Sequence, residues 1–331
     1  MNRQKRLLAG VLCLVLMAST MFTGCSVGNR QIYFASKSGR GDVFKIGELS
    51  CPKEEAKVYL ANYKNLYGNL YGTELWTEEY DTEEMEESIK DAVLSHLTKV
   101  YALNVYAAQK EITLSDAEEE EVEKAAKEYY DSLNRKERSY TGASKSDIRE
   151  MYRRYALAEK MYTQLMESVD SNVSEDEARI IDTYVLFVTD EKLANQIDKK
   201  IKNGATFERL ASSYNELDSM KATFGRGTYD KAVEGVVFAL DNEQVSSKIE
   251  ADGGYYFFQC INKYNEKLSE ENKSVIVEQR QKQAMEDVKA SIEKMYYSHF
   301  NTKLWDKITA PSSADVTTNS FFTTLDSYIS H

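Results

Sequence analysis

The sequence predicts an α+β protein in which a helical region is interrupted by a compact unit of strands and short helices. Apolar side chains recur at helical spacing over residues 82–111 and 145–169. Residues 178–266 instead predict the order strand, helix, helix, strand, helix, strand, strand. Only two prolines, Pro52 and Pro311, occur in the 331 residues, so little interrupts long helices elsewhere.

The first 24 residues predict a leader peptide. A basic stretch, MNRQKR, precedes an apolar run of about a dozen residues, which is shorter than the roughly 20 residues of a membrane span. The run FTGC that ends at Cys25 resembles the lipobox of bacterial lipoproteins. This resemblance implies cleavage before Cys25 and a lipid anchor on its sulfur, with the chain at the cell membrane and facing outside the cytoplasm. An ordinary secretory peptide and an uncleaved anchor are the alternatives, and the small, polar residues 25–41 predict a tether.

Residues 42–177 predict a helical module. It opens with a short strand around Phe44, a turn at Gly47 and a helix that starts near Pro52, a residue tolerated in a first helical turn. Three further helices are expected over residues 82–111, 115–134 and 145–169.

The chain returns to helix after the compact unit. Residues 267–308 carry an apolar seam at helical spacing, formed by Met285, Val288, Ile292, Met295 and His299. Such a seam needs a partner, so we expect this helix to return to the helical module. Residues 309–331 are rich in Ser and Thr and predict a loose tail, in which Phe321 and Phe322 could dock.

Composition excludes several classes of function. The net charge of −12 disfavours nucleic-acid binding, because the chain and a phosphate backbone would repel each other. The acidic helix over residues 115–134 lacks the glycines of a calcium-binding loop, and the three histidines are scattered. No Walker-type glycine loop is present, and no cofactor or metal is predicted. Cys51 and Cys260 could pair, but Cys260 in an apolar strand is more simply a buried small hydrophobe.

Residues 178–266 contain four runs with a common pattern: the run DTYVLFVTDEKLANQIDKKIKNGATFERLASSYN, the glycine turn FGRG, the helix VEGVVFALDNEQVS and the final strand GGYYFFQCINK. On these runs, residues 178–266 resemble a parvulin-type peptidyl-prolyl isomerase (rotamase) domain. Together with the flanking helices, the layout resembles the PrsA/SurA-type extracytoplasmic foldases. It implies a helical chaperone-like module with an inserted FKBP-like β-α-β domain, and unfolded or partly folded exported polypeptides as partners.

The site of the family is altered in this chain. Active parvulins carry a histidine in the first strand and another in the last, and the resemblance puts Tyr184 and Tyr256 at these positions. The acidic residue of the family has its nearest counterpart in Asp218. The resemblance assigns substrate binding to four further side chains. These are Phe224, Tyr229, Val233 and Phe238.

Three functions therefore remain open. An X-Pro bond rotates faster only if oriented polar groups and an apolar pocket bind the twisted amide. Tyrosines in place of histidines favour a foldase or holding chaperone that binds extended peptides through an aromatic groove without isomerising them. A competent isomerase that uses Tyr184, Asp218 and Tyr256 is one alternative, and an envelope adaptor with one partner is another. The aromatic residues, and the 13 tyrosines between residues 59 and 162, could equally be core packing.

Overall fold

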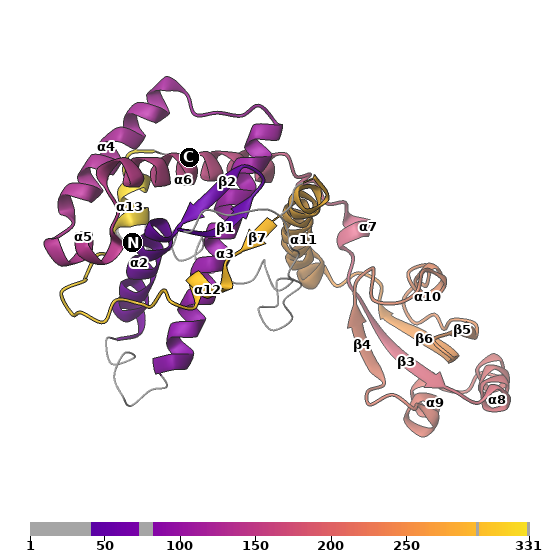
Figure 1. Cartoon of the computed structure of the whole chain (residues 1–331). Helices are drawn as coiled ribbons and strands as arrows, with labels where there is room; N and C mark the ends of the chain where they lie inside the picture. The colour runs from indigo at the N-terminus through magenta and orange to yellow at the C-terminus, as the bar shows by residue number, and fades with distance from the viewer. Residues whose placement is uncertain (1–40, 73–81, 296–297, 330–331) are drawn as a thin grey trace. The chain divides into compact units, whose positions relative to one another are not determined.

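The computed structural model describes residues 41–72, 82–295 and 298–329 (Figure 1). The chain divides into two compact units: Met1–Ser168 with Lys282–His331 form the larger unit, and Val169–Gln281 form the smaller one. The predicted fold class is confirmed, because a mixed unit of strands and helices interrupts a helical module. The predicted leader, the anchor at Cys25 and the tether lie outside the described residues.

The larger unit is mainly helical. Its elements are β1 Asp42–Ile46, β2 Leu49–Pro52, α2 Lys53–Tyr71, α3 Thr82–Gln109, α4 Asp116–Ser132, α5 Arg135–Thr141, α6 Lys145–Glu167, the end of α11 Glu266–Met295, β7 Ser298–Phe300, α12 Thr302–Trp305 and α13 Phe321–Asp326. The three long helices expected from hydrophobic spacing are α3, α4 and α6. Ser115 and Ser144 start α4 and α6 with capping boxes, so the first backbone N–H groups of both helices are bonded.

The expected helix over residues 267–308 is shorter than predicted. Helix α11 ends at Met295, whose side chain is 55% exposed, and β7 follows, with Phe300 opposite Phe44 of β1. A three-stranded antiparallel sheet of order β2-β1-β7 results. Strand pairing with β1 overrides the helical spacing here, so His299 lies in a strand and outside the helical seam.

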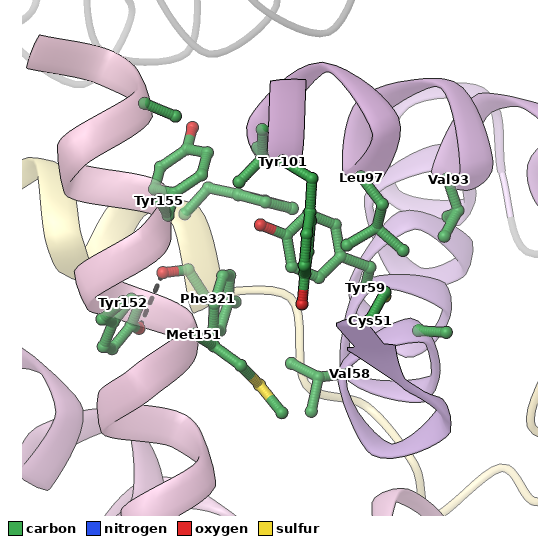
Figure 2. Packing of buried hydrophobic residues seen from close by; sticks show 14 of the residues in the cluster. Cys51, Val58, Tyr59, Val93, Leu97, Tyr101, Met151, Tyr152, Tyr155 and Phe321 are labelled. Carbon is green, nitrogen blue, oxygen red and sulfur yellow. Dashed lines mark hydrogen bonds between the residues drawn. The ribbon is translucent and has the colours of Figure 1, made fainter. Parts of the chain in front are cut away.

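Tyrosine rings form the core of the larger unit. Tyr59, Tyr101, Tyr152 and Tyr155 are at most 2% exposed, and Figure 2 shows them converging from α2, α3 and α6, with Phe321 of α13 beside Tyr152. The side chains of Met285, Val288 and Ile292 from α11 also belong to this core. These tyrosine rings are therefore packed inside the larger unit and do not form an exposed surface.

The carboxyl-terminal residues 309–329 are packed on the larger unit, so the expectation of a loose tail is wrong. Phe321 is 0% exposed and Phe322 is 2% exposed. Helix α13 contacts α4 and α2. The alternative that these two phenylalanines dock is confirmed.

The smaller unit is a four-stranded antiparallel sheet with helices on both faces. Its elements are α7 Glu175–Ala178, β3 Ile181–Val188, α8 Glu191–Lys202, α9 Phe207–Tyr214, β4 Lys221–Phe224, α10 Lys231–Val237, β5 Ile249–Ala251, β6 Gly254–Asn262 and the start of α11. The strand order is β4-β3-β6-β5, and the predicted sequence of strands and helices is confirmed. Side chains of α8 and α9 pack on one face, and those of α10 pack on the other.

The hairpin between β5 and β6 turns at Asp252 and Gly253. Their φ angles are 52° and 74°. Two consecutive left-handed residues are what a two-residue turn of type I′ requires, and Asp-Gly is a preferred pair for it. The turn fixes the register of β6 and therefore the face on which each of its aromatic residues lies.

Candidate functional site

Strands β3 and β6 present an aromatic surface on the side of α10. Because neighbouring residues in a strand point to opposite faces, only alternate pairs of the β3–β6 ladder reach this side. These include Val185 opposite Phe258 and Phe187 opposite Tyr256. We call the following rings the aromatic face: Phe187, Phe224, Tyr229, Phe238, Tyr256 and Phe258.

Tyr256 has aromatic neighbours on several sides. Its ring centroid is 4.5 Å from Phe187, 5.8 Å from Tyr229 and 5.8 Å from Phe258, on which it stacks. Its hydroxyl donates to Oδ2 of Asp252 at 3.4 Å. Burial, the Asp252 carboxylate and Tyr229 all raise the pKa of Tyr256, so the hydroxyl remains a protonated donor at neutral pH.

Tyr184 does not share a site with Tyr256. It lies in β3 opposite Gln259, on the face covered by α8 and α9. Its hydroxyl donates to Oε1 of Glu208 in α9 at 3.4 Å. The expectation that Tyr184 and Tyr256 form a pair is therefore wrong. The β3 residue that faces α10 is the next one along the chain, Val185, which is 2% exposed.

The four residues expected to bind substrate differ in accessibility. Phe224 and Phe238 are each 6% exposed and belong to the core of the aromatic face. Val233 is fully buried beneath the rings, which corrects its assignment as a ligand contact. Tyr229 is half-buried, as is Phe187, and these two rings form the accessible rim of the face.

Glu234 is a site residue that the motif comparison missed. Its side chain is buried, and its Oε1 accepts the backbone N–H groups of Gly227 at 2.6 Å and Tyr229 at 3.2 Å. These two bonds fix the loop that carries Tyr229. The sequence did contain one indication of this role: Glu234 is an acidic residue inside the apolar helix VEGVV. A carboxylate buried there needs hydrogen-bond donors.

Two arginines flank the ring of Phe238. The guanidinium carbons of Arg179 and Arg226 lie 5.0 Å and 4.5 Å from its centroid, within cation–π range. Asp176 binds both arginines, at 3.2 Å and 2.7 Å, and the Arg226 hydrogen bond lowers the pKa of Asp176. One carboxylate thus offsets part of the charge of the two arginines.

Asp218 lies apart from the aromatic centre. It is exposed in the loop between α9 and β4, a loop tied to β3 by the bond from the backbone N–H of Phe187 to Asn215. The carboxylate that contacts Tyr256 is Asp252. Asp252 was not predicted, because the hairpin turn rather than any sequence motif places it there.

Replacing Gly254 with alanine should destabilise the smaller unit by about 1–3 kcal/mol. The added Cβ would lie 2.4 Å from Cε2 of Phe187 and 2.8 Å from the carbonyl oxygen of Val188, so the ring must move away from residue 254. Thermal unfolding followed by circular dichroism measures the loss. Gly235→Ala is the matched control: it adds a Cβ in open space on α10, so it should be neutral or stabilising. Equal stability of Gly254→Ala and the parent chain would contradict the packing of Phe187 on Gly254.

Comparison with known proteins identifies the domain type. Residues 188–262 match the Rotamase family, described as a PPIC-type PPIASE domain. The smaller unit carries a parvulin-type domain. The chain is 30% identical over 108 residues to foldase protein PrsA 4 of Bacillus cereus, a match that covers 31% of this chain and 39% of that relative. It is 34% identical over 86 residues to foldase protein PrsA 1 of Listeria monocytogenes, covering 24% of this chain and 29% of that relative.

The matches to curated relatives are partial, so the chain spans less than two thirds of the length of either one. A solved structure of peptidylprolyl isomerase (PrsA) from Bacillus cereus aligns with 76% of this chain and 94% of its own, at 19% identity and a TM-score of 0.37. The parvulin-type domain is thus the part of the chain whose family is assigned.

Two features of the described residues bear on metal binding and on membrane association. Residues 41–72, 82–295 and 298–329 bring together no group of three or more His, Cys, Asp or Glu side chains that could hold a metal ion. Within the same ranges, no helix has both the length and the apolar character that crossing a bilayer demands. Cys51 and Cys260 are buried free thiols, and Cys260 belongs to the core of the smaller unit, on the side of the aromatic face.

Proposed function

We propose that this chain is a lipid-anchored foldase on the outside of the cytoplasm, which binds extended segments of exported polypeptides with little isomerisation of X-Pro bonds. The lipobox at Cys25 supports the anchor, and similarity to proteins named foldases supports the activity. The parvulin-type domain would supply one binding surface, the aromatic face.

The composition of the aromatic face carries this proposal. Isomerisation requires polar groups that bind the twisted amide more tightly than the planar one. On the β3 strand this face presents Val185 and Phe187, which offer no hydrogen bond. Thr183 lies on the same side, but its hydroxyl is buried and donates to the carbonyl of Ala222. The hydroxyl of Tyr256 donates to Asp252. Apolar rings with a few hydroxyls at the rim suit loose binding of an unfolded chain better than catalysis.

One observation favours a second candidate, a weak isomerase. Burial and the Asp252 carboxylate raise the pKa of both Tyr256 and Tyr229, so both hydroxyls keep their protons at neutral pH. Tyr256 could exchange its long bond to Asp252, 3.4 Å, for a bond to a substrate carbonyl. In this candidate Tyr256 would donate to the carbonyl of the prolyl bond. The sequence also left open an envelope adaptor, which would bind one partner and ignore other unfolded chains.

Two assays on the chain that starts at Ser26 test the proposal. One measures isomerisation of a short X-Pro peptide, and the other measures aggregation of an unrelated unfolded protein. We expect no isomerisation above background and clear suppression of aggregation. Tyr229→Ser should raise the concentration needed for suppression by about 3- to 10-fold, because it removes an accessible aromatic ring.

Tyr184→Ser is the matched control, since Tyr184 is also a half-buried tyrosine of the parvulin-type domain but lies on the opposite face of the sheet. It should leave suppression unchanged. Isomerisation that Tyr256→Phe abolishes would establish the isomerase in place of our proposal. Absence of both activities, with one protein retained from an extract, would establish the adaptor.

A further inference from the structure

The larger unit binds the backbone of its own carboxyl-terminal segment through side chains. Asn65 donates to the carbonyls of Val316 and Thr318, at 3.1 Å and 2.8 Å. Glu137 accepts the N–H groups of Thr317 and Thr318, at 2.9 Å and 2.8 Å. Further bonds join Lys64 to the carbonyl of Pro311, Asn134 to that of Asp315, Tyr140 to that of Thr309, Tyr152 to that of Phe321, and Asn62 to the N–H of Phe321. Because every polypeptide has these backbone groups, the contacts select an extended chain more than a sequence.

Two adjacent aromatic subsites follow the backbone contacts. Phe321 stacks on Tyr152 with centroids 4.5 Å apart, and its carbonyl accepts the Tyr152 hydroxyl (Figure 2). Phe322 stacks on His96 at 5.3 Å. The ring of Tyr59 contacts both phenylalanines, at 5.3 Å and 5.2 Å. The subsites therefore fit two consecutive aromatic residues, each stacked on a ring of the larger unit.

The groups that bind this segment are held by the larger unit itself. Asn62 is fully buried and also donates to Val58 and to the Tyr129 hydroxyl, both at 2.8 Å. Glu137 is 3% exposed, and its other oxygen accepts the N–H of Asn134 at 2.8 Å. These hydrogen bonds would hold the side chains of the site in position if the segment dissociated. Buried polar groups without partners are unfavourable, so another polypeptide should replace the segment more readily than the site stays empty.

The bound segment has little regular structure of its own. Residues 309–320 form no helix or strand, and only the short helix α13 follows. The segment is thus presented as an unfolded chain would be. Ser313 and Ala314 are exposed, so the chain can be cut there. The cut removes two turn bonds, from the N–H groups of Asp315 and Val316 to Ser313, and leaves the side-chain contacts that the larger unit makes from Asp315 onward.

We propose that the larger unit contains a polypeptide-binding site for segments that are extended up to a pair of adjacent aromatic residues and begin a short helix at that pair, and that residues 309–329 occupy this site in cis. The site lies between α2, α5 and α6 and is separate from the aromatic face of the parvulin-type domain. It goes beyond the function proposed above and does not depend on the isomerase state of that domain. An intramolecular segment competes at the millimolar effective concentrations typical of short tethers, so it would exclude weak ligands and yield to strong or abundant ones.

Peptide exchange on the full chain tests the proposal. A recognition sequence for a specific protease is inserted between Ser313 and Ala314, and the purified chain is cut in a non-ionic detergent, with detergent alone as the blank. A fluorescent peptide of residues 314–331 is then added, and its anisotropy is measured. We expect binding to the cut chain, displacement of the resident segment, and at least 100-fold weaker binding to the uncut chain.

Two further peptides distinguish an exchangeable peptide-binding site from a segment that is a fixed part of the fold. The peptide with Phe321→Ala and Phe322→Ala should bind about 100-fold more weakly or worse, since each buried ring is lost. An unrelated extended peptide with a central Phe-Phe pair should compete with the labelled one. The proposal fails if the cut chain unfolds, if it retains the resident segment without exchange, or if only the native sequence competes. Neither assay of the parvulin-type domain enters this result, so the two proposals can fail separately.

Discussion

Arg154→Met is expected to destabilise the larger unit by about 3–5 kcal/mol. Arg154 Nη2 lies 2.6 Å from Oε2 of Glu55, whose side chain is 0% exposed. The same oxygen accepts the Tyr101 hydroxyl at 2.7 Å. Burial acts to lower the pKa of Arg154, but the Glu55 carboxylate outweighs it and raises that pKa. Methionine would fill much of the volume and leave a buried carboxylate with one neutral donor. Denaturant unfolding followed by circular dichroism measures the cost.

The neighbouring residue supplies the control. Arg153 also binds a carboxylate, Glu119 at 2.8 Å, but its side chain is 44% exposed. Arg153→Met should therefore cost no more than about 1 kcal/mol. If Glu55→Gln is combined with Arg154→Met, much of the loss should return, because no buried charge remains. Equal costs for the two single arginine variants would contradict a role for burial in the Glu55–Arg154 pair.

Long-range contacts account for the fold features that could not be predicted. Hydrophobic spacing is a local property, and it located α3, α4 and α6 correctly. The end of α11 depends on β1, more than two hundred residues away in sequence, which pairs with Phe300. The Ser/Thr-rich composition of residues 309–331 is typical of a loose segment, yet Asn65 and Glu137 bind its backbone. Neither residue has a local pattern that indicates this contact.

The site was predictable in its residue types but not in its register. The strand Ile181–Val188 is apolar on both faces, so alternation of polar and apolar residues does not say which side chains face α10. A shift of one residue moves every side chain to the opposite face, which is the error made for Tyr184. Tyr256 lies on the aromatic face, where the Asp252-Gly253 turn sets the register of its strand.

Glu159→Gln should stabilise the larger unit at pH 8 and have little effect near pH 4.5. Burial, opposed by Lys99 and assisted by Asp326, raises the pKa of Glu159 from its ordinary 4.5 to about 7. Between pH 4.5 and 7 the unfolded chain releases a proton that the folded chain keeps, so stability falls as pH rises. The full loss is about 3 kcal/mol, which glutamine would avoid. Urea unfolding at several pH values measures the difference between variant and parent.

Asp326→Asn tests whether the charge of Asp326 contributes to the raised pKa of Glu159. Burial raises the pKa of Asp326 to about 6, so above that pH its charge opposes ionisation of Glu159. In the Asp326→Asn background, the gain from Glu159→Gln should be smaller and should develop at lower pH. Burial lowers the pKa of His96 to about 3, so its contribution to stability declines as pH falls from 6.5. The variant and its parent both contain His96, so this contribution cancels when their free energies of unfolding are compared. A gain from Glu159→Gln that is the same at pH 4.5 and pH 8 would show that Glu159 is ionised in the folded chain throughout, and α13 would then dock beside a permanent charge.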